Sequence, residues 1–266
     1  MTAKDDMSIS KNARVKTKDL RRAAYGARRK TIGILGGMGP EATAYFFDLI
    51  IRNTAAGRDR EHVPVIIRSD PRVPDRTGAI LHSGESPVPM LRAGMKALRR
   101  AGADIMVMPC VTAHYFLRDV VARENVTFVN LLDEARKYTL AAVPGIRKIG
   151  LIATTGTVRS GIVRDAYAGG GIEVIVPGKD EQEKVMEAVY GKRGIKAGFT
   201  TGRSRRTIQG VAKGLVRNGA EAIMAGCTEV PLVLRQEDLA VPFIEPMRIG
   251  ALACIKKAGY RIKKKS

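Results

Sequence analysis

The sequence has no tryptophan, few aromatic residues (5%) and only three cysteines in 266 residues. Cys110, Cys227 and Cys254 are odd in number and widely spaced, so neither a disulfide framework nor a zinc site with paired cysteines is indicated. No apolar run reaches the roughly 18 residues that a membrane span needs, and the N-terminus lacks the apolar segment of a secretory signal. These absences predict a cytoplasmic protein that makes no membrane contact.

Acidic residues are also scarce, because 26 Asp and Glu stand against 46 Lys and Arg and give a net charge of +20. Much of the excess lies at the two ends: residues 1–30 hold ten Lys or Arg, and residues 256–266 hold six. A basic tail can bind nucleic-acid phosphates, but basic and aromatic residues are not interleaved here as they are in nucleic-acid-binding surfaces. We therefore expect residues 1–30 to be a basic flexible extension, and we do not predict nucleic-acid binding as the main function.

From Thr31 onward the chain alternates short β-rich runs with helical stretches, which is typical of a parallel sheet covered by helices. The pattern also repeats. "TIGILGGMGP" (31–40) aligns with "KIGLIATTGT" (148–157), and "RRAGADIMVMPCVT" (99–112) aligns with "VRNGAEAIMAGCTE" (216–229), each at an offset of 117 residues. We predict an α/β fold of two similar lobes, each a roughly four-stranded parallel sheet flanked by helices, related by a pseudo-two-fold.

The repeat places two cysteines, Cys110 and Cys227, after equivalent apolar runs. Ligands of open parallel sheets bind beyond the carboxyl ends of the strands, so both cysteines are expected on facing walls of one cleft. A lone cysteine after an apolar run is usually a small buried hydrophobe, but its recurrence at equivalent strand ends favours a shared function. Cys254 has no counterpart on its apolar helical face and is predicted to be structural.

Two opposed thiols could form a redox pair, bind a metal, or carry a proton from one side of a carbon atom to the other. Redox pairs usually lie close in sequence, and no further metal ligands cluster here, so no metal is predicted. Proton transfer needs only what is present: one cysteine, as thiolate, removes the hydrogen on an amino acid's α-carbon, and the other, as thiol, protonates the opposite face. A helix N-terminus after each strand is expected to lower the thiol pKa toward neutrality.

The carbanion formed in such a reaction must be stabilised by donors aimed at the substrate α-carboxylate. The candidates are backbone amides of the "GGMGP" turn (36–40) and the hydroxyls of the threonines Thr112, Thr154, Thr155 and Thr228. An acidic substrate would also need a cation, and we favour Arg76 over Arg72 because an arginine can hold a carboxylate with two parallel bonds. Both arginines could instead be ordinary loop charges.

Two histidines lie near these motifs. His114 is one helical turn beyond Cys110, so it could orient or acidify the thiol or could be a packing residue; both readings stay open. His62 precedes an apolar run and is predicted to be a surface or structural residue.

Six motifs, "IGILGGMGPEAT", "VPDRT", "PCVTAH", "IGLIATTGT", "IKAG" and "AGCTEVPL", together resemble the aspartate/glutamate racemase family, most closely its aspartate racemase branch. The resemblance runs from about Thr31 to Ala258. It implies a cofactor-independent, usually dimeric enzyme that uses paired cysteines in a cleft between two lobes. Carried over by position, Cys110 and Cys227 are the catalytic pair, and the substrate contacts are Met38, Arg76, Thr112, Lys196 and Thr228.

The resemblance also implies that the chain crosses between the lobes near "VTFVN" (126–130) and "VPFIE" (241–245). The predicted domains are therefore the extension 1–30, lobe one (31–125 plus 242–266) and lobe two (126–241). The chain departs from the family at Val111, where asparagine is usual, and at Arg72, where glutamine is common. We expect Val111 to lie in the substrate site and to distinguish this protein from its relatives.

The sequence thus predicts a homodimeric racemase that interconverts L- and D-aspartate, and possibly the glutamate enantiomers, by proton transfer between Cys110 and Cys227. The alternatives are an isomerase or racemase of another dicarboxylate or of a hydantoin-type substrate, and a substrate-binding pseudoenzyme or regulator with a basic tail. Retention of both cysteines favours catalysis, whereas Val111 favours loss of it.

Overall fold

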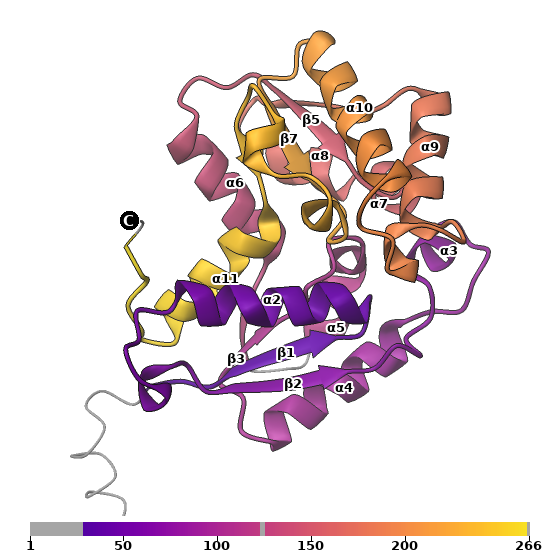
Figure 1. Ribbon diagram of the computed structural model, residues 1–266. Coiled ribbons are helices and arrows are strands. Elements are labelled where there is room, and N and C mark those ends of the chain that lie inside the picture. The colour runs from indigo at the N-terminus through magenta and orange to yellow at the C-terminus, as the bar shows by residue number, and fades with distance from the viewer. Residues whose placement is uncertain (1–28, 123–125, 265–266) are drawn as a thin grey trace, which may run out of the picture.

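The computed structural model describes residues 29–122 and 126–264 and shows two four-stranded sheets in which every strand pair is parallel (Figure 1). Nearly all of the predicted extension 1–30 lies outside the described residues. The strands of the first sheet are β1 (Ile32–Gly36), β2 (Val65–Ser69), β3 (Ile105–Val107) and β4 (Thr127–Val129). Those of the second sheet are β5 (Lys148–Ile152), β6 (Glu173–Ile175), β7 (Ala222–Ala225) and β8 (Phe243–Ile244).

The two sheets have the same strand order, β2-β1-β3-β4 in the first and β6-β5-β7-β8 in the second. The central strands are short apolar runs that are buried along their length, as expected where helices cover both faces of a parallel sheet. The α/β fold of two similar lobes predicted from the internal repeat is therefore confirmed.

The repeat extends to side chains that anchor the start of a strand. Asp104 accepts a hydrogen bond from the backbone N–H of Thr31 (2.9 Å), just before β1. Its counterpart Glu221, 117 residues later, accepts from the N–H groups of Arg147 (2.6 Å) and Lys148 (3.2 Å) at the start of β5. Each lobe thus ties its first strand to the turn before its third strand in the same way.

Ten α-helices and five short 3₁₀ helices surround the sheets within the described residues. The α-helices are α2 (Pro40–Asn53), α3 (Arg76–Ile80), α4 (Val88–Arg100), α5 (Leu117–Val121), α6 (Leu131–Ala142), α7 (Thr155–Ser160), α8 (Ile162–Ala168), α9 (Lys179–Tyr190), α10 (Arg203–Arg217) and α11 (Pro246–Lys257). The 3₁₀ helices are η1 (Asp59–Glu61), η2 (Thr112–Phe116), η3 (Ile195–Ala197), η4 (Val230–Leu232) and η5 (Gln236–Asp238). No helix in the described part of the chain has the length and apolarity needed to cross a membrane.

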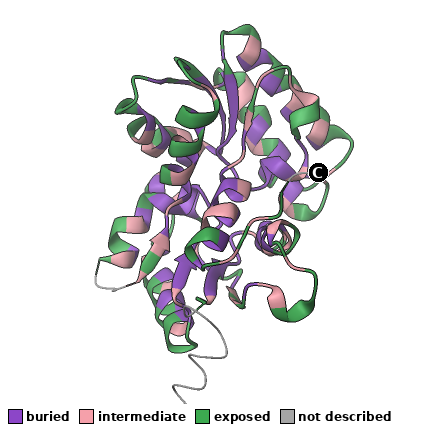
Figure 2. Cartoon of the chain, turned by 90° about the vertical axis from the view of Figure 1, so that its left-hand side faces the viewer, coloured by how far each residue is buried: buried purple, intermediate pink, exposed green. Residues whose placement is uncertain are grey.

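Each sheet has an apolar core on both of its faces, and Figure 2 shows buried residues concentrated along the strands and on the inner sides of the helices. In the first lobe α2 and α11 pack on one face and α4 on the other; in the second, α9 and α10 cover one face and α6 and α8 the other. Helix α11 contacts both α2 and α6, so the end of the chain joins the two lobes (Figure 1). Cys254 is fully buried in this helix and is packed among apolar residues.

The predicted limits of lobe two, at residues 126 and 242, each lie just before a short strand. Both strands pair with the sheet that precedes them in the chain. β4 pairs with β3, and β8 pairs with β7. The chain then enters the other lobe through α6 and through α11, whose residues Met247 and Cys254 lie in the core of the first lobe. We propose that the lobes are divided according to their sheets. The chain then crosses between the lobes directly after β4 and again directly after β8.

The strand order decides which loops can form a site. In each sheet the first strand lies between the next two strands of the chain: β1 lies between β2 and β3, and β5 lies between β6 and β7. The order in which successive strands are added to the sheet therefore reverses at β1 and at β5. A crevice forms at such a reversal, beyond the carboxyl ends of the strands. The loop after β1 lies there beside the loop that carries Cys110, and the loop after β5 lies beside the loop that carries Cys227.

The turn after β1 depends on Gly37, whose φ of +97° lies in a region that side chains disfavour. A Cβ atom at Gly37 would also overlap the backbone of Asp70, whereas a Cβ at Gly102, with the same φ of +97°, would meet no atom within 4 Å. We predict that Gly37→Ala lowers the free energy of unfolding by about 1–3 kcal/mol more than Gly102→Ala does. Chemical denaturation of both variants measures the difference, and equal losses would show that the turn tolerates a side chain.

Candidate active site

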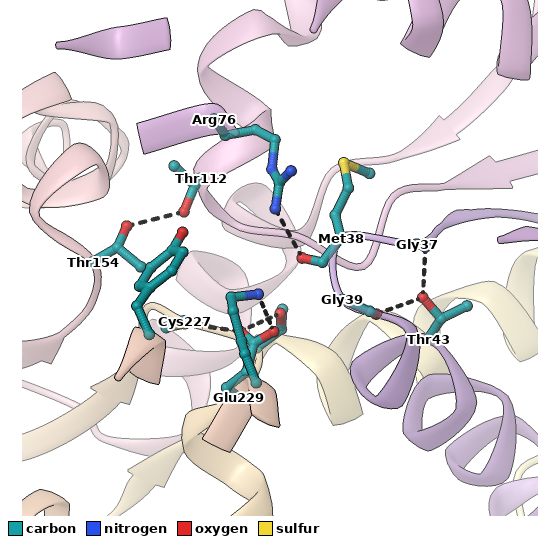
Figure 3. Close-up of polar contacts among 12 residues, drawn as sticks. Gly37, Met38, Gly39, Thr43, Arg76, Thr112, Thr154, Cys227 and Glu229 are labelled. Carbon is teal, nitrogen blue, oxygen red and sulfur yellow. Dashed lines mark hydrogen bonds and ion pairs between the residues drawn. The ribbon is translucent and has the colours of Figure 1, made fainter. Parts of the chain in front are cut away.

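A cavity of about 400 Å³ lies where the two lobes meet. Its walls include Gly37, Gly39 and Arg76 from the first lobe and Tyr190, Lys196 and Glu229 from the second. A Cβ built on Gly39 would lie 3.4 Å from Glu229 Oε1 and 3.7 Å from Lys196 Nζ, so the turn after β1 directly faces the charged groups of the other lobe. Figure 3 shows this convergence of side chains from both lobes.

On the first wall, Arg76 is buried at the start of α3, with only 8% of its surface exposed. Its guanidinium donates hydrogen bonds to the carbonyls of Val73 and Pro74 (both 3.1 Å) and Met38 (3.4 Å). Burial opposes the positive charge, but the interaction with the Cys110 thiol contributes to holding the pKa of Arg76 above its ordinary value. Its Nε atom is buried and has no hydrogen-bond partner within residues 29–122 and 126–264, so this cation has one unused donor.

Cys110 follows β3 and is 5% exposed. Of the two open readings of His114, its contacts favour the structural one: its Nδ1 hydrogen-bonds the Cys110 carbonyl (2.9 Å), and its Nε2 accepts from the Leu131 N–H (3.1 Å). Burial lowers the His114 pKa to about 4, so the ring is neutral near pH 7. His114 thus fixes the backbone that carries Cys110 and ties it to the start of α6.

On the second wall, the Cys227 thiol donates a hydrogen bond to Oε2 of Glu229 (2.9 Å), and Lys196 Nζ pairs with Oε1 of the same carboxylate (2.6 Å). Burial works against the Glu229 charge, yet Lys196 and the thiol hold the Glu229 pKa below its usual value. Burial and the Glu229 charge raise the pKa of Cys227 well above its usual range. In this arrangement Cys227 is a thiol that faces a carboxylate.

The expectation that a helix N-terminus lowers the cysteine pKa is therefore wrong for Cys227. The element that directly follows each cysteine is a short 3₁₀ helix, η2 after Cys110 and η4 after Cys227, and not an α-helix. A helix dipole acts within the first turn of an aligned helix, and three residues of 3₁₀ helix supply little of it. The Glu229 carboxylate, two residues from the thiol, dominates over that field.

Threonine hydroxyls join the two lobes at the base of the site. Thr112 of the first lobe contacts Thr157 (2.8 Å) and Thr154 (3.2 Å) of the second, and Thr77 donates to Thr154 (3.3 Å). All four side chains are buried. Thr154 also caps α7 by accepting from the N–H of Thr157 (3.4 Å). The predicted substrate contacts Thr112 and Thr154 thus lie together, bonded to each other.

The other residues singled out in the sequence are Thr228, Met38, Val111 and Arg72, and they differ in their surroundings. Thr228 is buried beside Glu229 and donates to its carboxylate (3.3 Å), and Met38 is buried with its carbonyl accepting from Arg76. Val111 packs in the apolar core of the second lobe, which gives its side chain a packing function. Arg72 is an exposed loop residue paired with Asp70 through bonds of 2.9 Å, so Arg76 alone of the two loop arginines reaches the cavity.

One predicted donor and two residues that were not predicted complete the site. Thr155, expected among the carboxylate donors, instead accepts from the side chain of Gln182 (3.3 Å). Glu229 and Tyr190 were not predicted, although Glu229 lies two residues beyond Cys227 in the same motif. Tyr190 crosses the cleft to Asp75 (3.1 Å), and its ring lies 5.4 Å from Lys196 Nζ.

In residues 29–122 and 126–264 no three His, Cys, Asp or Glu side chains are grouped as a metal site would require. His62 is half-buried, and its Nδ1 has no hydrogen-bond partner in the part of the chain that the structure describes. It does not line the cavity between the lobes.

Comparison with known proteins identifies the family. The family model described as Asp/Glu/Hydantoin racemase matches residues 35–254, which is most of the chain. This protein belongs to the Asp/Glu/hydantoin racemase family. The resemblance inferred from the six motifs is therefore confirmed, and its cysteine motifs both lie within the matched range.

Solved structures and curated proteins resemble this family member over nearly its whole described length. An aspartate racemase from Picrophilus torridus is 33% identical, covers 88% of this chain and 96% of its own, and superposes with a TM-score of 0.78. An aspartate racemase homologue from Pyrococcus horikoshii OT3 is 26% identical, with coverages of 86% and 99% and a TM-score of 0.69. The broad specificity amino-acid racemase RacX of Bacillus subtilis is 25% identical over 85% of this chain and 95% of its own.

The contact between Cys227 and Glu229 can be tested through thiol reactivity. We predict that Glu229→Gln lowers the Cys227 pKa, because it removes the negative charge beside the sulfur and releases Lys196 to act on it. A fall of about one pKa unit raises the thiolate fraction about tenfold, and the thiolate is the form that alkylates. Mass spectrometry of the Cys227 peptide after timed iodoacetamide treatment measures the rate.

The matched control is Glu237→Gln, which removes an exposed carboxylate from η5. It should leave the alkylation rate of Cys227 unchanged. If Glu229→Gln alkylates no faster than the unaltered protein, the carboxylate does not control the state of this thiol.

Proposed function

We propose that this protein is an amino-acid racemase for an acidic substrate, with aspartate favoured over glutamate, that works by proton transfer between Cys110 and Cys227. The observation that carries the proposal is the presence of one cation near each cysteine at the edge of one cavity: the buried Arg76 beside Cys110, and the partly buried Lys196 in the Cys227 cluster. Lys196 is already paired with Glu229, but the buried Nε of Arg76 has no hydrogen-bond partner among the described residues, and the second carboxylate of an acidic amino acid would supply one.

The relatives support an acidic substrate without deciding between aspartate and glutamate. The Picrophilus torridus structure is that of an aspartate racemase, and a glutamate racemase from Corynebacterium glutamicum is 28% identical over 55% of this chain. We favour aspartate because the aspartate racemase from Picrophilus torridus is the more similar of the two, at 33% identity over 88% of this chain.

The protonation states suggest how a reaction cycle starts. Exchange by two bases needs one thiolate and one thiol, and the Glu229 contact keeps Cys227 as the thiol. We therefore assign the starting thiolate to Cys110. Its sulfur takes the hydrogen from the substrate α-carbon, and Cys227 gives its proton to the opposite face of the carbanion, which inverts the centre and leaves Cys227 as thiolate. The enzyme is then set to bind the other enantiomer.

The threonines are suited to hold the substrate α-carboxylate. Thr112, Thr154 and Thr157 satisfy one another in the free protein, so a carboxylate that enters the cleft would replace these neutral bonds with charge-assisted ones. Donors aimed at that carboxylate stabilise the negative charge that develops when the α-hydrogen leaves. The steps need no group other than these side chains.

The position of Val111 weakens the pseudoenzyme alternative. Its side chain serves the second lobe's core, so the replacement of asparagine alters packing while both cysteines and both cations stay in place. Isomerisation of another dicarboxylate would use the same cations and remains the alternative activity. That the protein forms a homodimer and that it lies in the cytoplasm both stay predictions.

The proposed activity is tested by incubating L- and D-aspartate separately in deuterated water. Proton NMR should show loss of the α-hydrogen signal, and chiral chromatography should show both enantiomers approaching an equal mixture. Cys110→Ala or Cys227→Ala should slow racemisation at least about a hundredfold, which is the scale of a lost acid or base.

Cys254→Ala is the matched control, because Cys254 is buried in α11 outside the site and its variant should racemise at close to the normal rate. If aspartate and glutamate neither exchange nor racemise, the racemase proposal fails. Turnover of maleate in place of both amino acids would support the isomerase.

A further inference from the structure

A second cavity, of about 630 Å³, lies in the second lobe apart from the cysteines. It is formed by α9, the first turn of α10 and the segment 191–202 between them, and the two helices lie side by side in Figure 1. Five cationic residues line it, with Glu187 as the single acidic residue of the lining. The cations are Lys184, Lys192, Arg193, Arg203 and Arg206. We name it the basic cavity.

These charges are not neutralised within the described part of the chain. Lys184, Lys192, Arg203 and Arg206 have no carboxylate within 4.0 Å, whereas the neighbouring Arg205, which does not line the cavity, pairs with Asp238 (3.0 Å). Arginines on one helical turn therefore divide into one that has an internal partner and two that open into the cavity. Like charges held this close repel each other, and a bound anion would relieve that repulsion.

The first turn of α10 adds to the positive field. It contains no acidic residue, and its N-cap, Gly202, offers no side-chain acceptor to the free amides. A helix start usually carries the opposite charge pattern, with acids near the N-terminus. Here the positive end of the helix and two arginines face the same hollow, which is a combination that anions fill in other proteins.

One wall of the basic cavity is aromatic. Phe199 is 42% exposed, and the Arg193 guanidinium lies 5.4 Å from its ring centre. An exposed ring stacked with a cation offers a flat surface to another planar group. The size of the cavity lies within the range that small-molecule sites occupy. Charge and shape together fit a ligand with a polyanionic part and a flat apolar part.

We propose that the basic cavity is a binding site for a phosphate-bearing small molecule of the nucleotide class. The cations and the start of α10 would hold the phosphates, and Phe199 would hold the base. The segment 191–202 also carries Lys196, whose side chain lines the cavity between the lobes, so an occupied basic cavity would order the segment that positions a cation of the candidate active site. The binding proposal is independent of the racemase activity.

Isothermal titration calorimetry of the full chain at about 0.15 M salt tests the site, with ATP, ADP and tripolyphosphate as probes. Because the protein carries a net charge of +20, removing two positive charges anywhere could weaken its attraction for an anion. The control variant must therefore lose the same charge outside the cavity. The double variant Arg203→Ala/Arg206→Ala removes two cavity cations, and Lys213→Ala/Arg217→Ala removes two exposed charges from the same helix outside the cavity.

We expect saturable binding that the cavity variant weakens at least about tenfold and the control variant changes less than about twofold, because two charge-assisted contacts are lost only in the former. Phe199→Ala should weaken ATP and ADP but not tripolyphosphate. If Phe199→Ala leaves ATP and ADP binding unchanged, or weakens tripolyphosphate binding as much, the ligand class is reduced to polyphosphate and the nucleotide proposal is overturned.

Hydrogen exchange locates the bound ligand. Protection by ADP should fall on residues 184–207. Equal weakening by the two double variants, or protection confined to residues around Gly37 and Arg76, would show nonspecific attraction or binding between the lobes and would overturn the proposal. So would the absence of saturable binding by all three probes.

Discussion

Parallel strands release the chain at one edge of a sheet, and in this protein the two sheets bring that edge to the same place. Gly37 and Cys110 follow neighbouring strands of the first sheet, and Thr154 and Cys227 follow neighbouring strands of the second. The threonine contacts between α3, η2 and α7 then hold the lobes together at this edge. The residues of the candidate site are far apart in the sequence, and this topology brings them together.

The buried ion pair between Lys196 and Glu229 sets the electrostatics of the second wall. Its N–O distance is 2.6 Å, and 22% of the lysine side chain and 4% of the glutamate side chain are exposed. A buried charge without a partner is costly, so each member of the pair keeps the other ionised. The Glu229 carboxylate in turn holds the Cys227 proton, whereas Cys110 lies beside Arg76 and has no carboxylate contact among the residues that the structure describes. The two walls therefore share a topology but differ in charge.

The internal repeat predicted the two lobes and the parallel sheets, because strand ends and periodicity are local features of a sequence. Arg76 and Lys196, the two cations that the resemblance assigned to the substrate, both line the cavity. The state of Cys227 could not be predicted, since it depends on whether the Glu229 side chain turns toward the thiol or toward solvent. Likewise, the direction of the Val111 side chain follows from packing of η2 against the second lobe, which no local pattern encodes. His114 was undecided for the same reason: its partners are backbone groups brought together by the fold.

The central claim is that the two cysteines serve opposite faces of one carbon atom, and it is tested most directly by single-cysteine exchange. In deuterated water, the Cys110→Ala and Cys227→Ala variants would each be given L- and D-aspartate separately, and α-hydrogen exchange would be followed without regard to racemisation. The account predicts that each variant exchanges one enantiomer with retention of configuration, and that the enantiomer differs between the two variants. Exchange of the same enantiomer by both variants, or of both enantiomers by either, would contradict it.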